Sequence, residues 1–330
     1  MARQPRRSIL LLSISVLFIC LFAYMAFSFS SIRTSPTAAF TSSPVSISPQ
    51  VFKEGLNESE CCRGVNGLEL WGSATKWGSD HRLQSAEVCC RACKAACTGP
   101  GDQCLCNAWV FCGDKDQCKD KFGECWLKKQ KDVLSPEIVS SGDHFMWTSG
   151  LVFAKGEGIL GLETSHGTLR IKLFPDCAPQ SVAYITELLG VRSCAGCRIV
   201  RAEDRGQSWD SKGDHMWRTS FGPPYAVIQG TLEADGILFK AIPKEACPGI
   251  KRGSVAWVGH GPEFFISLAN HHEWKRSYTV FGFVLPEDME IAEKISRLPS
   301  KLDVWGNVTV SVLENSVSLR VVRATGPSEL

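Results

Sequence analysis

Polar and apolar residues alternate along much of the second half of the chain, which is the period of half-buried β-strands. The clearest case is Thr168–Phe174, which follows a turn at His166-Gly167 and stops before Pro175. Further short runs predict strands at Val152–Phe153, Gly158–Glu163, Cys197–Ala202, Ala226–Gly230, Gly253–Val258, Phe264–Leu268, Thr279–Val284 and Val308–Val322. We therefore expect this part of the protein to be mostly β.

Two segments in the same region have helical spacing instead. Ala178–Leu189 predicts one helix, and Asp288–Leu298 predicts a second, in which Ile291, Ile295 and Leu298 share a face. Many strands combined with two helices are typical of a closed barrel that helices cap at its ends. We find no internal repeat.

Cysteines are concentrated ahead of this region, where 11 of the 16 lie between Cys61 and Cys125. This density is typical of a small module held by disulfides in an oxidising compartment. Glu87–Cys97 predicts a helix, and the segments Cys104–Cys112 and Cys125–Lys128 predict strands. Because 11 is an odd number, one thiol is left over, pairs outside the module, or pairs between chains.

We expect disulfides both within this module and beyond it. The candidate cysteines are Cys61, Cys62, Cys89, Cys90, Cys93, Cys97, Cys104, Cys106, Cys112, Cys118, Cys125, Cys177, Cys194, Cys197 and Cys247. The Cys194-x-x-Cys197 spacing also occurs in redox and zinc sites, but it precedes a strand here rather than opening a helix. A disulfide is the better interpretation, with Cys177 and Cys247 as candidate partners.

The N-terminus predicts a membrane helix. Residues 1–8 carry three arginines and form an expected cytosolic tail, and residues 9–29 are uncharged and apolar over a length that can span a bilayer. No clear small-x-small cleavage site is present, so we favour an uncleaved signal anchor over a cleaved signal peptide. The positive flank places the rest of the chain on the luminal side.

Residues 30–56 are rich in Ser, Thr and Pro and predict a flexible stalk. Asn57 and Asn307 each begin an N-glycosylation acceptor triplet. These features indicate a single-pass type II membrane protein of the Golgi or endoplasmic reticulum, with secretion after signal cleavage as the alternative.

Composition narrows the function classes. The chain is 44% hydrophobic and 21% charged, with a net charge of +2 and no basic block interleaved with aromatic residues. We therefore expect no nucleic-acid partner. Asp114-Lys-Asp116 has the Asp-x-Asp form of metal-dependent glycosyltransferases, and His271-His272 suggests a metal. The first lies within the cysteine module and adjacent histidines rarely converge on one ion, so we expect neither a metal nor a cofactor.

Several motifs together resemble one family. The run Leu162–Val182 (LETSHGTLRIKLFPDCAPQSV), Gln229-Gly230, Gly261-Pro262-Glu263-Phe264-Phe265 and Val280-Phe281-Gly282 are similar to the cyclophilins, which are peptidyl-prolyl cis-trans isomerases. The resemblance implies an eight-stranded antiparallel barrel capped by two helices over residues 150–325. It covers about half of the chain and points to membrane-anchored cyclophilin-like proteins of plant type.

The resemblance also implies site residues. Arg201 matches the arginine that donates to the twisted prolyl amide, and Gln229 matches the glutamine that anchors the substrate backbone. Phe265 matches the floor of the proline pocket. The remaining candidates for substrate binding, at positions where the family lines its pocket, are Val227, Ala256, Trp257, Glu263 and Tyr278.

Four positions, three of these candidates and the adjacent Ala226, depart from the family pattern. Ala226 replaces an aromatic residue, Val227 a methionine, Glu263 a glutamine and Tyr278 a histidine. Glu263 would bring a carboxylate beside Arg201. An insert at residues 202–225 and a shortened loop before Phe264 change the rim of the site.

Residues 57–149 resemble the PAN/apple modules, in which a helix is cross-linked to a small antiparallel sheet. The resemblance implies a small disulfide-rich α+β module that binds proteins or carbohydrates. Two functions remain open for the whole chain. It is either a membrane-tethered isomerase of proline-containing chains in the secretory pathway or a degenerate cyclophilin-like binding protein with the module as its second contact.

Overall fold

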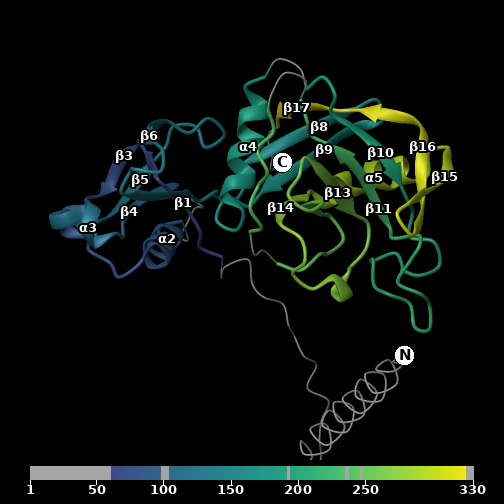
Figure 1. Cartoon of the computed structure of the whole chain (residues 1–330), viewed down its shortest axis with the longest axis horizontal. Helices are drawn as coiled ribbons and strands as arrows, with labels where there is room; N and C mark the ends of the chain where they lie inside the picture. Colours follow the sequence, from purple (N-terminus) through teal and green to yellow (C-terminus); the bar gives the residue numbers. More distant parts are fainter. Residues whose placement is uncertain (1–60, 98–103, 192–193, 235–237, 246–247, 325–330) are drawn as a thin grey trace, which may run out of the picture. The chain divides into compact units, whose positions relative to one another are not determined.

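Ten antiparallel strands pair in one sheet in the second part of the chain (Figure 1). The computed structural model describes residues 61–97, 104–191, 194–234, 238–245 and 248–324. The strands of the large sheet are β8 (Ile159–Thr164), β9 (Gly167–Leu173), β10 (Arg198–Ala202), β11 (Val227–Thr231), β12 (Ser254–Trp257), β13 (Glu263–Ser267), β14 (Val280–Val284), β15 (Ser300–Trp305), β16 (Val308–Ser318) and β17 (Arg320–Arg323). The expectation of a mostly-β fold is confirmed.

The spatial order of these strands is β15-β16-β10-β11-β13-β12-β14-β9-β8-β17. This order has β15 and β17 as its two ends, so a closed eight-stranded barrel is not found among the described residues and stays a prediction. Only Leu319 separates β16 from β17, and the first of these strands pairs with β10 while the second pairs with β8. One continuous segment thus contributes β16 near one end of the sheet and β17 at the other end.

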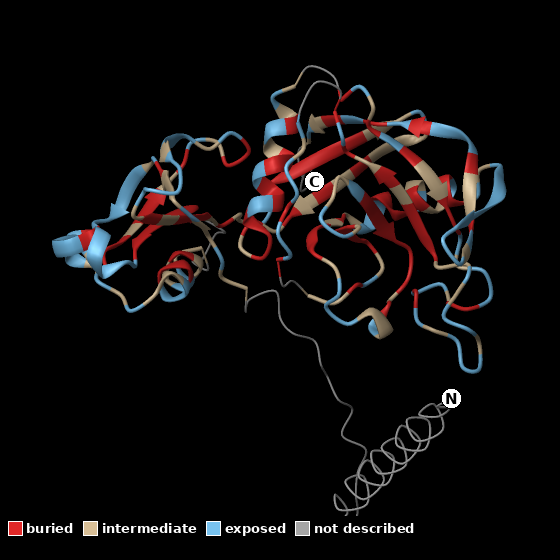
Figure 2. Cartoon of the chain, viewed as in Figure 1, coloured by how far each residue is buried: buried red, intermediate tan, exposed pale blue. Residues whose placement is uncertain are grey.

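Two helices accompany the sheet. Helix α4 (Pro179–Leu189) contacts β17, and α5 (Met289–Ser296) contacts β9 and β11. Pro179 suits the first turn of a helix because its missing N–H would have no partner there. Figure 2 shows that the buried residues follow the strands of the sheet and one side of α4. This core positions the loops and strand ends that line the site described below.

The carboxylate of Glu245 caps the N-terminus of α4. It accepts hydrogen bonds from the backbone N–H groups of Gln180 (2.9 Å) and Ser181 (3.1 Å) and from Ser181 Oγ (2.6 Å). An anion at this position satisfies orphan donors and interacts favourably with the helix dipole. Trp257 Nε1 donates to the same Ser181 Oγ over 3.0 Å, which joins β12 to the start of α4.

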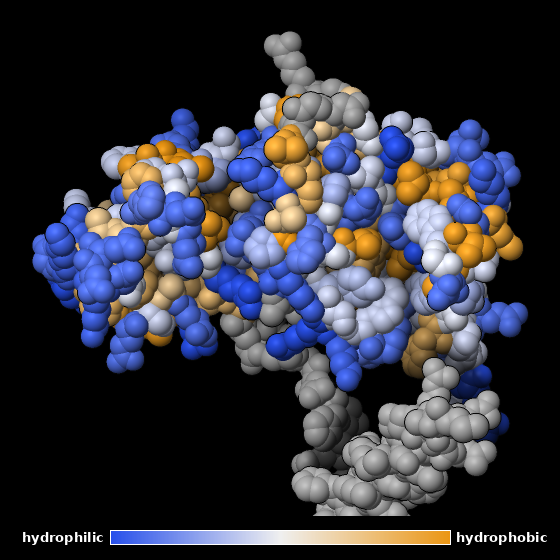
Figure 3. Space-filling model, in the orientation of Figure 1, coloured by the Kyte–Doolittle hydropathy of each residue, from blue (hydrophilic) through white to orange (hydrophobic). Residues whose placement is uncertain are grey.

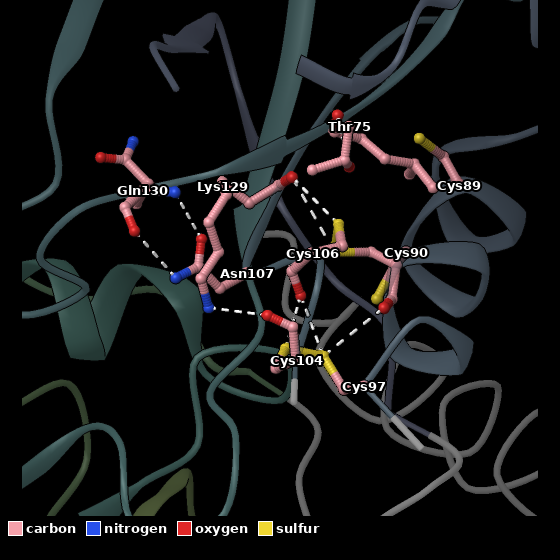
Figure 4. Close-up of a disulfide and its surroundings, with 12 residues drawn as sticks. Thr75, Cys89, Cys90, Cys97, Cys104, Cys106, Asn107, Lys129 and Gln130 are labelled. Atoms are coloured by element: carbon pink, nitrogen blue, oxygen red, sulfur yellow. Dashed lines mark hydrogen bonds between the residues drawn. A yellow bond between two sulfur atoms is a disulfide. The ribbon is translucent and has the colours of Figure 1, made fainter. Parts of the chain in front are cut away.

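The cysteine-rich region has its own sheet, in the order β1-β7-β4-β5-β3. Its elements are β1 (Val65–Asn66), β3 (Ser73–Lys76), α2 (Ala86–Ala95), β4 (Ala108–Cys112), α3 (Lys115–Cys118), β5 (Cys125–Lys129) and β7 (Trp147–Leu151), with β2 (Leu68–Leu70) and β6 (Ile138–Ser141) as a separate pair. Ser85 caps α2 by accepting from Val88 N–H. Asn107 and Gln130 exchange two hydrogen bonds across the region (Figure 4).

Disulfides join seven pairs of described cysteines, and the expectation of a disulfide-bonded protein is confirmed. The pairs are Cys61–Cys177, Cys62–Cys90, Cys89–Cys125, Cys93–Cys106, Cys97–Cys104, Cys112–Cys118 and Cys194–Cys197. The odd cysteine is Cys61, which pairs outside the cysteine-rich region with Cys177. Cys194 and Cys197 pair with each other rather than with Cys177, and Cys247 lies outside the described residues.

Several expectations fall on parts that the structure does not describe. The cytosolic tail (residues 1–8), the signal anchor (residues 9–29), the stalk (residues 30–56) and the acceptor Asn57 lie outside the described residues. Among the helices that are described, none is both long and apolar enough to cross a bilayer. Asn307 is described, and it lies exposed in the two-residue turn between β15 and β16.

One predicted strand is absent from the structure, and one strand of the large sheet was not predicted. Val152–Phe153 is not a strand, because β7 already ends at Leu151. Strand β15 was not predicted, because all six of its residues are exposed and it has no alternating buried face. Its conformation follows from its pairing with β16 along its whole length, from Ser300 opposite Leu313 to Trp305 opposite Val308.

Candidate functional site

A pocket of about 350 Å³ opens over strands β10, β11, β13 and β16. It is lined by Arg201, Tyr225, Val227, Gln229, Val258, Phe265, Trp274, Tyr278, Trp305, Val308 and Val310. Aromatic and aliphatic side chains dominate this lining, and Arg201 is its one charged member among the described residues. A mostly apolar hollow with few convergent polar groups is the usual form of a ligand site.

Strand pairing brings Arg201 and Gln229 together. The two residues are directly opposite each other on β10 and β11, after a bulge between Ile199 and Arg201. Arg201 Nη1 donates a hydrogen bond to Gln229 Oε1 over 3.0 Å. The guanidinium is held at the rim of the hollow, where the Arg201 side chain is 13% exposed.

Phe265 forms the floor of the hollow. It is opposite Gln229 across the β11–β13 pair and is 4% exposed. Its ring meets the rings of Trp274 and Tyr278 edge to face, with centroids 5.7 and 5.1 Å apart. Aromatic pairs in this geometry hold one another in place beyond the effect of burial alone.

Tyr278 lies where the family resemblance would place a histidine, and it also lines the pocket. Burial raises the pKa of its hydroxyl, while the positive charge of Arg201 acts in the opposite direction. Tyr278 is therefore neutral at physiological pH and contributes a ring and a hydroxyl rather than a charge. Val227, which replaces a methionine of the family pattern, is 4% exposed and lies in the wall.

Three aromatic residues of the pocket, Tyr225, Trp274 and Trp305, were not predicted as site residues from the sequence. Tyr225 ends the insert, and Trp305 ends strand β15. The guanidinium carbon of Arg201 lies 5.6 Å from the centre of the Tyr225 ring and 5.8 Å from that of Trp305. Ala226 itself is fully buried and has a φ of +51°, and the preceding Tyr225 lines the pocket.

Three predicted binding residues are not in the lining. Ala256 and Trp257 on β12 are 0% and 1% exposed, and the Trp257 ring stacks on Phe281 within the core, with centroids 4.3 Å apart. Glu263 is exposed at the start of β13. The carboxylate that meets Arg201 belongs to Glu203, which accepts from Arg201 Nε over 3.0 Å.

The insert is packed against the loop that carries Trp274. Its Trp209 is 3% exposed, and the Trp209 ring meets His271 edge to face at 5.0 Å. His271 stacks on Trp274 with centroids 3.7 Å apart. Asn270 Nδ2 donates to Asp214 of the insert over 2.7 Å. The insert thus supports one wall of the pocket from behind.

Asp114 and His271 come from the two motifs that suggest a metal in the sequence, and both have structural roles. Asp114 caps α3 by accepting from the N–H groups of Asp116 and Gln117. His271 is fully buried beside Glu273, with Nδ1 and Oε1 2.7 Å apart, whereas its neighbour His272 is exposed. Among the described residues, no group of three or more His, Cys, Asp or Glu is arranged to hold a metal ion.

Hydrophobic side chains also reach the surface beside the site. Leu302 and Val304 of β15 are 76% and 65% exposed, and an apolar patch covers β15 and β16 in Figure 3. Trp305 follows them in sequence and is 37% exposed. The β15–β16 hairpin therefore presents apolar residues both to the pocket and to solvent.

Comparison with protein families gives one match. Residues 159–317 match the model described as cyclophilin type peptidyl-prolyl cis-trans isomerase/CLD. A comparison with curated proteins finds no match. The matched residues include all eleven residues that line the pocket, Arg201, Gln229 and Phe265 among them.

Similar solved structures include a cyclophilin type peptidyl-prolyl cis-trans isomerase of Cryptosporidium parvum, at 16% identity and a TM-score of 0.37, with 52% of this chain and 99% of that chain covered. The same enzyme in the presence of the dipeptide Ala-Pro gives 14% identity, a TM-score of 0.36, and coverage of 51% and 99%. The cyclophilin AquaCyp293 from Hirschia baltica gives 14% identity, a TM-score of 0.34, and coverage of 50% and 73%. On the family match, residues 159–317 of this chain are a domain of the cyclophilin type.

Proposed function

We propose that the cyclophilin-type domain binds proline-containing chains in the pocket over Phe265 and accelerates rotation about their X-Pro bonds. The uncatalysed rotation has a barrier of about 18–20 kcal/mol because the amide has double-bond character. A catalyst needs to bind the twisted amide more tightly than the planar one. No cofactor is required for that task.

The observation that carries the proposal is the hydrogen bond between Arg201 and Gln229 at the rim of an apolar hollow. The proline ring would lie on Phe265, with Trp274 and Tyr278 around it. The Arg201 guanidinium would donate to the prolyl nitrogen or the adjacent carbonyl, and Gln229 would bind the peptide backbone. Stabilising a developing charge or lone pair with a fixed donor is a large contribution in many enzymes.

A second function is a binding protein without turnover. The contacts of Arg201 favour it, because its guanidinium already meets the Glu203 carboxylate and two aromatic rings. In that case the pocket would hold an extended proline-containing segment, and the PAN/apple-like cysteine-rich module would make the second contact, to a protein or a carbohydrate. The abundance of disulfides supports a luminal or extracellular location for either function.

The test follows cis/trans exchange of a proline tetrapeptide by NMR in the presence of the full chain with its disulfides intact. Arg201→Ala should lower the exchange rate roughly 100-fold. Arg198→Ala is the matched control, since Arg198 is an exposed arginine on the same strand. Peptide binding without faster exchange would support the binding protein instead. No binding and no faster exchange would contradict both functions.

A further inference from the structure

Glu203 is a buried carboxylate next to the pocket, directly after strand β10. The residue is 3% exposed, and its side chain is 1% exposed. A charge that is removed from water costs several kcal/mol unless it is paired and hydrogen-bonded. Both oxygens of this carboxylate therefore need hydrogen-bond donors within the protein.

Three donors from three segments of the chain meet the carboxylate. Oε1 accepts from Arg201 Nε over 3.0 Å and from the backbone N–H of Ser311 over 3.2 Å. Oε2 accepts from the backbone N–H of Tyr225 over 2.7 Å. One side chain thus joins the end of β10, the end of the insert and strand β16.

These three segments are the ones that surround the guanidinium. Tyr225 brings one aromatic wall, and β16 is the partner of the strand that brings Trp305. Val312, next to Ser311, is opposite Arg201 in the β10–β16 pair. A change at Glu203 would therefore be transmitted to Arg201 and to both aromatic walls.

The bonds also fix the plane of the guanidinium. Its donors project in a rigid planar fork, so two bonds in different directions set its orientation. Arg201 Nε points to Glu203 and Nη1 points to Gln229. Nη2 has no hydrogen-bond partner among the described residues, so it is the group that remains for a bound peptide.

We propose that Glu203 is a positioning residue, which aims Arg201 Nη2 into the pocket and holds Tyr225 and the β15–β16 hairpin around it. The catalytic part of this proposal rests on the proposed isomerase function. Glu203 itself does not touch the peptide. It acts through Arg201, whose orientation it sets.

The experiment compares Glu203→Gln, Glu203→Asp and Glu314→Gln in the full chain. Glu314 is an exposed carboxylate on β16 and serves as the matched control for loss of one charge. We expect Glu203→Gln to lower kcat about tenfold with a smaller change in KM, because a misaimed donor is felt most in the transition state. Glu203→Asp keeps the charge and should restore part of kcat, and Glu314→Gln should equal the wild type.

A second readout does not depend on turnover. In the full chain labelled with ¹⁵N-arginine, the Arg201 Nε–H resonance is identified by its loss in Arg201→Lys. It should shift in Glu203→Gln, shift less in Glu203→Asp, and stay unchanged in Glu314→Gln. If Glu203→Gln does not fold, the Asp variant still gives both measurements.

The outcomes separate the two proposals. An absent wild-type rate with a shifted Arg201 resonance would contradict the isomerase function and keep Glu203 as the residue that orients Arg201. An unchanged resonance in Glu203→Gln, or a kcat equal to that of the wild type while Arg201→Ala is impaired, would overturn the positioning role.

Discussion

The guanidinium carbon of Arg201 lies 5.8 Å from the centre of the Trp305 ring, so the tip of the exposed β15–β16 hairpin reaches the side chain of the neighbouring strand β10. The indole is only 37% exposed although every residue of β15 faces solvent to some degree. A contact of this kind contributes about 0.5–1 kcal/mol at an exposed site. It also places a large apolar surface beside the floor formed by Phe265.

Trp305→Ala should therefore weaken binding of a proline-containing peptide roughly two- to fivefold, which corresponds to the loss of about 0.5–1 kcal/mol. Isothermal titration calorimetry with the full chain would measure this. Leu302→Ala is the control, because Leu302 lies on the same strand, is 76% exposed and does not line the pocket. An equal loss in both variants would mean that the hairpin acts through its general stability.

Replacement of both Cys61 and Cys177 by serine should destabilise the protein by about 4–5 kcal/mol, because a bond that closes a long loop restricts the unfolded chain strongly. These cysteines are 116 residues apart, whereas Cys194 and Cys197 are only 3 apart. The double serine variant of the second pair is therefore the control and should lose less stability. Denaturant unfolding followed by tryptophan fluorescence compares the two, and equal losses would argue against the loop-length effect.

Glu245 predicts a pH dependence of stability. Burial raises the pKa of its carboxyl, although the hydrogen bonds from Ser181 and Gln180 act in the opposite direction. The folded protein thus binds this proton more tightly than the unfolded chain does. The contribution is present below the unfolded pKa of about 4.3 and is lost as the pH rises through the folded pKa.

Glu245→Gln removes this titration. We expect the wild type to gain the most stability relative to the variant at about pH 4 and below. The difference in the free energy of unfolding should then decrease as the pH rises towards neutrality. Urea titrations at a series of pH values give the difference. A constant difference over this range would show that the carboxyl titrates alike in the folded and unfolded states.

His271 predicts a pH dependence of stability of the opposite sign, with stability increasing as the pH rises. Burial lowers the pKa of its imidazole, with the Glu273 carboxylate acting against this effect. The folded protein binds the proton less tightly than the unfolded chain, so the contribution to stability is present above the unfolded pKa of about 6.5 and is lost as the pH falls through the folded pKa.

His271→Phe keeps an aromatic ring against Trp274 and removes the titration. The stability of the wild type relative to this variant should fall between about pH 7.5 and pH 5.5. His272→Phe is the control, since His272 is exposed. If His272→Phe removed the pH dependence and His271→Phe kept it, the effect would belong to His272 and the prediction for His271 would be wrong.

Much of the sheet could be predicted because its strands have a buried face. Strand β9 runs from Gly167 to Leu173 with alternating burial, and the sequence predicts Thr168–Phe174. The predicted helix Ala178–Leu189 differs from α4 by one residue. Strand β15 could not be predicted in this way, because its residues are all exposed and only its partner strand determines its conformation.

The candidate site could be predicted only where neighbouring strands build it. Arg201, Gln229 and Phe265 lie on β10, β11 and β13, and their register brings them together. Tyr225 and Trp305 reach the pocket from an insert and a hairpin, and local sequence does not determine where such segments fold back. Ala256 and Trp257 lie one strand further along, where the core takes up their side chains.

The bond between Cys61 and Cys177 also has a consequence for proteolysis. It encloses every peptide bond from Cys61 to Cys177 within one covalent loop. A protease that nicks the chain once in this stretch would leave both fragments attached, and only a reductant would let them migrate separately on a gel. Separation of the cysteine-rich part from the cyclophilin-type domain would thus require reduction as well as cleavage, or a second cut that removes the segment outright.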